Sequence, residues 1–455
     1  MRLSRFNLTV PSKKGELLLF NPWTCALVGL EPDFYHRYLD PETGDPNLAS
    51  ADVQTQFLEG HFTVPDGVDE LEQYRFERAR ARFATDRLDL VLSPTMNCNL
   101  ACVYCFETVR RPGLMSSDAV ARLKAFVSER LTTIHTLTVT WYGGEPLMAQ
   151  DVIRDIGQWL SAETKARHVS YAAKILTNGL LLTPKVAKTL QAGGITLAQV
   201  NLDGRREVHD RRRPRAGGGG TYDTIIRNLL EAPPDLQLAI RVGVDNENRE
   251  ECWRLYDTLL DLGLAQRHSV LIRPICESPG VCQSAAESCL GLPGFFSWYL
   301  GCLGQRLDAG LSVAGLDDLY PQPTVGCMSQ HLNLYMVDPD GDFQRCLEHV
   351  GVKEQSVGRL GEPLTFGPVL QAWMSVDPLR IEGCRECRLL PLCGGGCPAR
   401  WLERGRPECS PYQTTLTDIL RLHDRWPATE AHGPDTSPAG GAAIAKKEMS
   451  PVGPA

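Results

Sequence analysis

The chain lacks a long apolar run, a secretory signal core and an excess of positive charge. No stretch of about 18 apolar residues occurs among its 455 residues, so no membrane span is expected. Near the N-terminus only Leu17–Phe20 is continuously apolar, which is too short for a signal peptide. Lys and Arg number 47 against 55 Asp and Glu, and this net charge of −8 disfavours a nucleic-acid partner. We therefore expect a cytoplasmic protein with neither membrane nor nucleic acid as a partner.

Internal repeats are also missing, whereas cysteine is abundant. Sixteen cysteines occur in the chain. Disulfides are rare in cytoplasmic proteins, and chains of this length seldom need them for stability. Metal ligation is therefore the expected role, and the cysteine spacings indicate which metal centre is involved.

Six strand-like runs alternate with helix-like stretches between Leu88 and Ile275. The runs cover residues 88–95, 137–142, 171–177, 195–202, 237–244 and 269–275, and the helix-like stretches cover 116–131, 151–164, 184–191, 221–231 and 250–262. Ser116, Ser117 and Thr183 are suitable N-terminal caps. The alternation predicts an α/β fold with a parallel sheet, either open or curled into a partial (β/α)6 barrel. In such sheets, functional groups gather at the carboxyl ends of the strands.

The segments on either side of this barrel differ from it in composition. Residues 1–87 show no strong helical period, but ELLLFNPWTCALVGL is a candidate hairpin. Residues 88–312 contain the barrel and a helix-like stretch at 293–311. Residues 313–426 are rich in Cys, Gly and Pro, which favours a domain held together by metal. Residues 427–455 contain few large apolar side chains and are expected to be disordered.

The first cysteine group, CxxxCxxC, follows directly after the first predicted strand. Its members are Cys98, Cys102 and Cys105. Three thiolates suit a 4Fe–4S cube and leave one iron open for a substrate to chelate. Zinc would require a fourth ligand nearby, and a simple redox pair is the other alternative.

This motif, taken with others in the same order, resembles the radical S-adenosylmethionine (SAM) superfamily over about Leu88–Ile275. Tyr104 matches the aromatic position that lies beside the adenine in the family. Gly143, Gly144 and Glu145 match the GGEP motif, which in the family binds the methionine amino group of SAM. A main-chain carbonyl or Glu145 can accept hydrogen bonds from an ammonium, and glycines allow close approach of the main chain.

The same resemblance assigns two residues after the fourth predicted strand. It implies that Asn201 lies near SAM and that Arg213, in HDxxR, pairs with the SAM carboxylate. Family members often carry Ser at the position of Asn201. Because Arg211 and Arg212 precede Arg213, the register of this match is open.

A second cysteine group resembles the SPASM domain, a twin-cluster extension of radical SAM enzymes that modify peptides. The resemblance implies an outer 4Fe–4S cluster on Cys384, Cys387, Cys393 and Cys409, and an inner cluster on Cys327, Cys346 and Cys397. A zinc ribbon is the alternative for the Cys384-x2-Cys387 pair.

Three cubes with one open iron need eleven ligands, and the two motifs supply ten. Cys282, Cys289 or Cys302 completes the inner cluster, or that cluster keeps an open iron. Cys276 follows the sixth predicted strand and is a candidate for lining the pocket. We expect Cys25 and Cys252 to be small buried hydrophobes.

As implied by the resemblance, the reduced cluster cleaves SAM to a 5′-deoxyadenosyl radical, which abstracts hydrogen from a ribosomally made peptide. The outcome is a crosslink or another side-chain modification, and a flavodoxin or ferredoxin-type protein donates electrons. Sulfatase maturases carry Asp after the cysteine matching Cys346, whereas this chain has Leu347 and then Glu348, the candidate catalytic residue. The alternatives are a sulfatase-type maturase that forms formylglycine and a non-catalytic iron–sulfur electron-transfer protein.

The segment before about Leu88 is expected either to dock the leader of the substrate peptide or to cap the open barrel. Its apolar runs at 15–20 and 25–30 can supply a sheet edge for an extended peptide.

Overall fold

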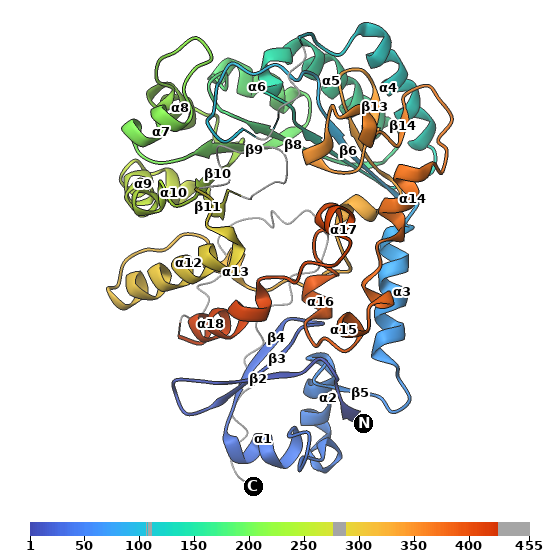
Figure 1. Cartoon of the computed structure of the whole chain (residues 1–455), viewed down its shortest axis with the longest axis vertical. Helices are drawn as coiled ribbons and strands as arrows, with labels where there is room; N and C mark the ends of the chain where they lie inside the picture. The colour runs from blue at the N-terminus through green and yellow to red at the C-terminus, as the bar shows by residue number, and fades with distance from the viewer. Residues whose placement is uncertain (106, 108–111, 276–287, 426–455) are drawn as a thin grey trace. The chain divides into compact units, whose positions relative to one another are not determined.

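The computed structural model describes residues 1–105, 107, 112–275 and 288–425, which form two compact units (Figure 1). The first unit contains Met1–Ala81, Phe296–Cys327 and the described residues from Asp377 onward. The second unit contains Arg82–Phe295 and Met328–Val376. The cysteine-rich segment 313–426 therefore contributes to both units, while the expected disordered tail lies outside the described residues.

A nine-stranded sheet forms the centre of the second unit. Its strands are β6 (Arg87–Leu92), β7 (Thr136–Trp141), β8 (Ser170–Thr177), β9 (Ile195–Leu202), β10 (Gln237–Val244), β11 (Ser269–Pro274), β12 (Leu334–Val337), β13 (Asp342–Gln344) and β14 (Gly358–Arg359). The order is β11-β10-β9-β8-β7-β6-β12-β13-β14, with parallel pairing from β11 to β12. Since β6 pairs with β7 and β12 and not with β11, the barrel is open, which confirms the expected partial barrel.

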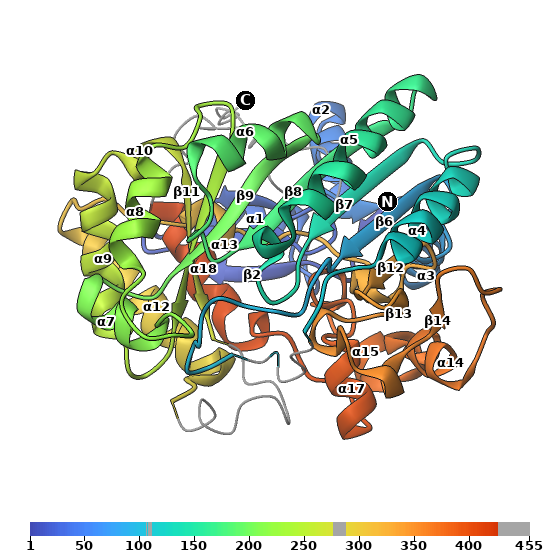
Figure 2. The same ribbon diagram turned by 90° about the horizontal axis from the view of Figure 1, so that it is seen from above.

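Helices connect the parallel strands and run along the outer side of the curved sheet (Figure 2). They are α4 (Ser117–Arg130), α5 (Gln150–Ala166), α6 (Pro184–Ala192), α7 (Arg206–Arg212), α8 (Tyr222–Leu230), α9 (Arg249–Asp261) and α10 (Leu264–Arg267). Ser116 caps α4 by accepting from the Ala119 amide at 3.1 Å, and Thr183 caps α6. All six expected strands are confirmed, with ends within three residues of the expected ones.

The two faces of the sheet differ in polarity and burial. On β7, Leu137, Val139 and Trp141 are buried, whereas the alternating Thr138 and Thr140 are only partly buried. A parallel sheet that is covered on both faces carries apolar residues on both. The polar second face therefore indicates an interior that receives polar ligands.

Two small sheets and several helices form the first unit. The strands are β1 (Arg2–Leu3) with β5 (Thr63–Val64), and β2 (Leu8–Pro11), β3 (Leu17–Asn21) and β4 (Ala26–Leu30). The helices are α1 (Pro32–Tyr38), α2 (Ala51–Glu59), α3 (Glu70–Arg82), α13 (Leu316–Leu319), α15 (Glu382–Arg385), α16 (Leu390–Cys393), α17 (Pro398–Arg404) and α18 (Tyr412–Arg425). Antiparallel β3 and β4 confirm the hairpin expected at 16–30. Leu392, Leu416 and Leu420 pack in one core with side chains of this sheet.

Residues 1–87 form helices, including the long helix α3, although their sequence shows no strong helical period. Helix α3 buries Glu70, Tyr74, Arg78 and Arg82, one residue on each turn. Glu70 accepts hydrogen bonds from the Ser4 hydroxyl and the Arg5 amide. An apolar periodicity cannot reveal a helix whose buried face is mostly charged.

Candidate functional site

The loop carrying Cys98, Cys102 and Cys105 follows β6 and is bonded along its length to the segment after α7. The Ala101 amide donates to the Pro214 carbonyl at 2.9 Å, and the Val103 amide donates to the Arg212 carbonyl at 3.0 Å. These main-chain bonds place the CxxxCxxC motif beside HDxxR.

The GGEP turn after β7 contacts the start of the same loop. Gly143 has φ +120°, and a Cβ at this position would lie 2.3 Å from the Thr95 carbonyl oxygen. A Cβ on Gly144 would lie 2.4 Å from the Asn97 carbonyl oxygen, which also accepts from the Glu145 amide at 2.8 Å. Glycine is therefore required at both positions for this close approach.

The Glu145 carboxylate is fully buried and already accepts three hydrogen bonds. They come from the Thr177 hydroxyl at 2.6 Å and from the amides of Asn178 and Leu147, at 2.7 and 3.0 Å. Burial raises the pKa of Glu145, against the opposite effect of these bonds. The side chain thus fixes the end of β8 to the GGEP turn.

Sequence reasoning missed Thr177 and Asn178 as parts of this site. Asn178 also contacts the first cysteine, with 3.9 Å between its Nδ2 atom and Cys98 Sγ. The signal was present in the Thr177-Asn178-Gly179 turn at the end of a predicted strand.

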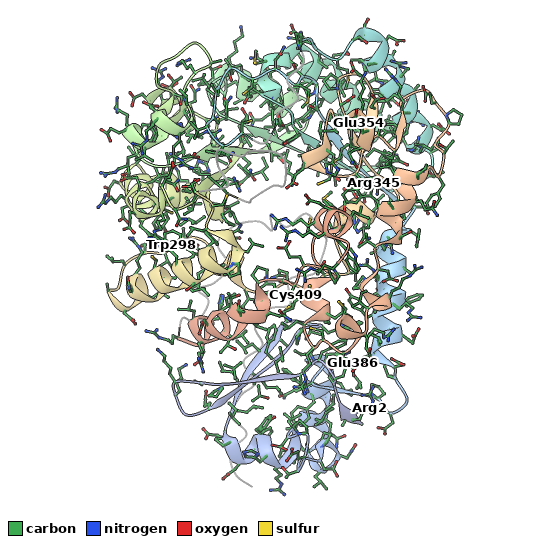
Figure 3. The ribbon with its side chains drawn as sticks, viewed as in Figure 1. Arg2, Trp298, Arg345, Glu354, Glu386 and Cys409 are labelled. Carbon is green, nitrogen blue, oxygen red and sulfur yellow. The ribbon has the colours of Figure 1, made fainter. Side chains whose placement is uncertain are left out.

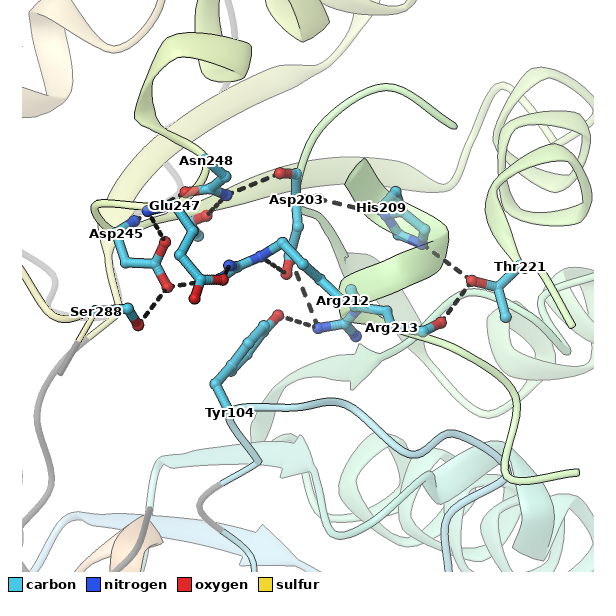
Figure 4. A network of polar contacts seen from close by, with 11 residues as sticks. Tyr104, Asp203, His209, Arg212, Arg213, Thr221, Asp245, Glu247, Asn248 and Ser288 are labelled. Carbon is cyan, nitrogen blue, oxygen red and sulfur yellow. Dashed lines mark hydrogen bonds and ion pairs between the residues drawn. The ribbon is translucent and has the colours of Figure 1, made fainter. Parts of the chain in front are cut away.

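Arg212 lies fully buried among carboxylates (Figure 4). Its guanidinium lies 2.7 Å from Asp245, 3.0 Å from Glu247 and 3.4 Å from Asp203. Asp203 and Asp245 are themselves buried at the ends of β9 and β10. The pKa of Arg212 is raised by these carboxylates, against the effect of its burial. Arg212 therefore links the ends of β9 and β10, and its guanidinium is occupied by these carboxylates.

Arg213 donates to the Tyr104 hydroxyl at 2.6 Å and also lies 3.9 Å from Asp203 (Figure 4). Burial raises the pKa of Tyr104, so the phenol stays neutral and accepts this bond. Within the described residues, the buried Arg213 Nε and Asn201 Oδ1 have no hydrogen-bond partner. These two unsatisfied polar atoms fit a ligand that offers both acceptors and donors.

His209 supports the same segment and is uncharged at neutral pH. Its Nδ1 accepts from the Asp203 amide, so Nε2 carries the proton toward the Thr221 hydroxyl at 3.1 Å. Burial lowers the pKa of His209 to about 4. Thr221 in turn donates to the Arg213 carbonyl, and this chain of bonds holds the main chain of Arg213.

Cys346 lies in the same unit, near the GGEP turn. Tyr142 packs in a core that includes the partly buried Leu347. Burial raises the pKa of Tyr142, and the nearby charges of Glu107, Cys105 and Cys346 act in the same direction. Glu348 lies half-buried in the short helix η4 (Leu347–His349) that follows Cys346.

Four thiols of the first unit lie on α15, just after α15, on α16 and before α18. They are Cys384, Cys387, Cys393 and Cys409, the last of which is labelled in Figure 3. Burial raises the pKa of Cys384, and the charges of the other three thiols raise it further. Thiols that raise one another's pKa are close enough to repel as thiolates, and a shared cationic centre would relieve that repulsion.

The spacing of these sulfurs disfavours zinc. Tetrahedral zinc with bonds of about 2.3 Å holds its sulfurs about 3.8 Å apart. In the described part of the chain, only Asp338, Asp340 and Asp342 bring three candidate ligand atoms within 4.8 Å of one another. A cube accommodates wider thiols, because each sulfur binds a different iron.

The remaining cysteines divide by burial. Cys25 and Cys252 are buried, as expected, and burial raises the pKa of Cys25 to about 12. Cys289 and Cys302 are half-buried, whereas Cys276 and Cys282 lie outside the described residues. Of the expected inner-cluster ligands, Cys327 and Cys397 belong to the first unit and Cys346 belongs to the second.

Comparisons with known proteins agree with this site. Residues 92–259 match the model of the Radical SAM superfamily, so the chain contains a radical SAM domain. It is 25% identical to the serine-type anaerobic sulfatase-maturating enzyme of Klebsiella aerogenes, over 71% of this chain and 82% of that protein. It is 27% identical to the mycofactocin maturase MftC of Mycobacterium ulcerans, over 69% of this chain and 83% of that protein.

Two solved structures share the fold. Native anSMEcpe with bound AdoMet aligns with a TM-score of 0.57 at 19% identity, over 74% of this chain and 97% of that chain. SuiB of Streptococcus suis bound to the precursor peptide SuiA aligns with a TM-score of 0.52 at 14% identity, over 90% of this chain and 97% of that chain. No helix in the described ranges is long and apolar enough to cross a membrane.

Substitution of the adjacent arginines tests whether Arg212 is the one that pairs with the buried carboxylates. Arg212→Ala leaves buried Asp245 without its cation and leaves Asp203 with only the more distant Arg213, at 3.9 Å, so the free energy of unfolding of the second unit should fall by about 3–5 kcal/mol. Arg211→Ala is the matched control, because Arg211 is exposed, and it should stay within about 0.5 kcal/mol of wild type. Urea unfolding followed by circular dichroism measures both variants, and equal losses would contradict the assignment.

Proposed function

We propose that this chain is a radical SAM/SPASM maturase that modifies a ribosomally made peptide, installing a crosslink or another side-chain change. One observation carries the proposal. The CxxxCxxC loop is held between the GGEP turn and the HDxxR segment, at the carboxyl ends of β6, β7 and β9. The CxxxCxxC, GGEP and HDxxR motifs thus meet at one edge of the sheet, where α/β enzymes bind their ligands.

The three thiolates of Cys98, Cys102 and Cys105 would hold a 4Fe–4S cube with one iron open. The cube in its reduced state would supply one electron for cleavage of SAM to methionine and a 5′-deoxyadenosyl radical, which can abstract hydrogen from carbon. The chain's own residues bind and orient the reactants. Asn178 adds a weak N–H···S contact to Cys98, which stabilises the thiolate form.

SAM would be held by residues with unsatisfied buried atoms. Arg213 pairs with the carboxylate through Nε, while Tyr104 holds the other side of the guanidinium. Asn201 offers Oδ1 as an acceptor, and the Gly143–Glu145 main chain approaches closely enough to accept from the ammonium. Glu348 is proposed as a proton acceptor for the substrate, since it follows Cys346 near the GGEP turn.

The auxiliary clusters would remove an electron from the product or hold the substrate. The outer site is formed by Cys384, Cys387, Cys393 and Cys409. The effect of these thiols on the pKa of Cys384 and Cys409 supports their grouping. Cys327, Cys346 and Cys397 form the proposed inner site, with Cys282, Cys289, Cys302 or an open iron in the fourth position. A flavodoxin or ferredoxin-type donor in the cytoplasm would supply the electrons.

The substrate proposal rests on the relatives and on the first unit. A mycofactocin maturase and a sulfatase-maturating enzyme are both similar to this chain. SuiB, solved with its precursor peptide, aligns over 90% of this chain, against 74% for anSMEcpe. Strand β4 is an edge strand paired only with β3 among the described residues, so it can accept an extended leader.

A sulfatase-type maturase is the second candidate, favoured by the similarity to the Klebsiella enzyme. Leu347 replaces the Asp that the sulfatase branch carries after the matching cysteine, which favours the peptide branch. Assays with a sulfatase-derived peptide and with a cognate precursor would distinguish the two. A non-catalytic electron-transfer protein would have no use for Tyr104, the GGEP turn and Arg213 together.

Replacement of Cys98, Cys102 and Cys105 by Ala should abolish 5′-deoxyadenosine release. Without these thiolates no open iron is presented at the strand ends. The assay uses dithionite-reduced, anaerobically reconstituted protein with SAM and measures the nucleoside by chromatography. Cys25→Ala and Cys252→Ala are controls that should keep the product. SAM cleavage that persists in the triple variant would refute the proposal.

Arg213→Ala should weaken SAM binding by about 1.5–3 kcal/mol, the loss of one charge-assisted hydrogen bond. Equilibrium dialysis with labelled SAM measures the dissociation constant. Arg211→Ala is the matched control, and its affinity should be unchanged. A larger loss for Arg211→Ala than for Arg213→Ala would show that the register of the motif is wrong.

Docking at β4 predicts a local change in amide exchange. Addition of the cognate precursor should slow exchange at Ala26–Leu30 by about tenfold or more, because new inter-strand hydrogen bonds form there. Mass spectrometry of peptic fragments measures the effect, with β2 as the internal control. If the precursor binds and β4 is unprotected, the segment has the capping role instead.

A further inference from the structure

A compact acidic turn lies between β12 and β13, outside the site described above. Its sequence is Asp338-Pro339-Asp340-Gly341-Asp342, and one carboxylate oxygen from each aspartate lies within 4.8 Å of the others. Asp338 and Asp342 are buried, with 1% and 7% of their surfaces exposed, while Asp340 is exposed. Three like charges this close repel one another unless a cation or a proton intervenes.

The buried carboxylate of Asp338 is only half satisfied. Its Oδ1 accepts from the amides of Asp340 and Asp342 at 3.0 and 2.9 Å, which fixes the turn. Its Oδ2 is buried and has no hydrogen-bond partner among the described residues. Burial and the charges of the other two aspartates raise the pKa of Asp338. An unsatisfied buried carboxylate oxygen is costly and needs a ligand or a proton.

A small cavity of about 40 Å³ adjoins this carboxylate. It is lined by Asp338, Asp340, Met96, Gly113 and Gly351, among others. This volume suits one dehydrated ion with a water molecule. Arg359 lies 3.6 Å from the Asp342 carboxylate and donates to the Asp340 carbonyl at 3.2 Å.

We propose that Asp338, Asp340 and Asp342 bind a hard divalent cation of the Ca²⁺ type. All side-chain ligands are oxygens, which excludes a preference for zinc or for iron–sulfur chemistry. Three carboxylates on one irregular turn suit Ca²⁺ better than Mg²⁺, which keeps most of its waters and uses one or two carboxylates. Acidic residues at alternate positions also occur in known calcium loops, although here Gly341 comes earlier than the glycine of an EF-hand.

The ion would stiffen the hairpin that leads into Cys346. Strand β13 ends at Gln344, and the next residue is the buried Arg345, which is labelled in Figure 3. Arg345 donates to the carbonyls of Ser329, His331 and Leu334. Strand β12 pairs with β6, the strand that precedes the CxxxCxxC loop. The site therefore acts on the scaffold of the cysteines and does not depend on the proposed reaction.

The test is calcium titration of the full-length, cluster-loaded protein by calorimetry after chelator treatment. We expect one site with a dissociation constant of about 10⁻⁵–10⁻³ M. Asp338→Asn keeps the Oδ1 acceptor that fixes the turn and removes the charge, so binding should weaken at least tenfold. Asp342→Asn is the second variant should Asp338→Asn fold poorly. Asp151→Asn, an exposed change on α5, is the charge-matched control and should bind as wild type does.

A thermal midpoint measured with and without 5 mM CaCl₂ is the second readout. Wild type should gain roughly 3–6 °C and Asp338→Asn should gain nothing. Absence of binding in wild type overturns the proposal, and so does equal binding by all three variants. A higher midpoint of Asp338→Asn without calcium, together with no calcium response in wild type, would show that Asp338 is simply protonated.

Discussion

The main-chain bonding of the loop that follows β6 is the constraint on which the site depends. Three thiolates can share one cube only if a flexible CxxxCxxC segment is held in a single conformation. Here the GGEP turn supports the beginning of the loop, and the segment after α7 supports its middle. Each support in turn depends on a buried charged side chain, Glu145 in the first case and Arg212 in the second.

This arrangement separates structural charges from those available to a ligand. Both Glu145 oxygens accept hydrogen bonds from neighbouring main-chain and hydroxyl groups, and Arg212 is surrounded by three carboxylates. Among the described residues, Arg213 Nε and Asn201 Oδ1 are buried and have no hydrogen-bond partner. A site that binds a zwitterion needs such unsatisfied groups, because a fully bonded side chain offers nothing to the ligand.

Much of the fold and of the candidate site was predictable from the sequence, and the features that were not predicted have physical causes. The six barrel strands were predicted because their apolar residues alternate or run continuously, as in β7 and β9. Helix α3 was not predicted because its buried face carries Glu70, Arg78 and Arg82. The choice among Arg211, Arg212 and Arg213 also stayed open, since only burial and partners distinguish them. Pairing of β12 with β6 joins segments about 240 residues apart, and no local pattern indicates it.

The central claim is that the two cysteine groups hold iron–sulfur cubes and not zinc. Iron, acid-labile sulfide and zinc content of the anaerobically reconstituted full-length chain tests it most directly. The account predicts about eleven to twelve irons per chain, a matching amount of sulfide and no stoichiometric zinc. About four irons with one or more zinc ions per chain would contradict the auxiliary-cluster assignment, and iron-free protein with bound zinc would contradict the account as a whole.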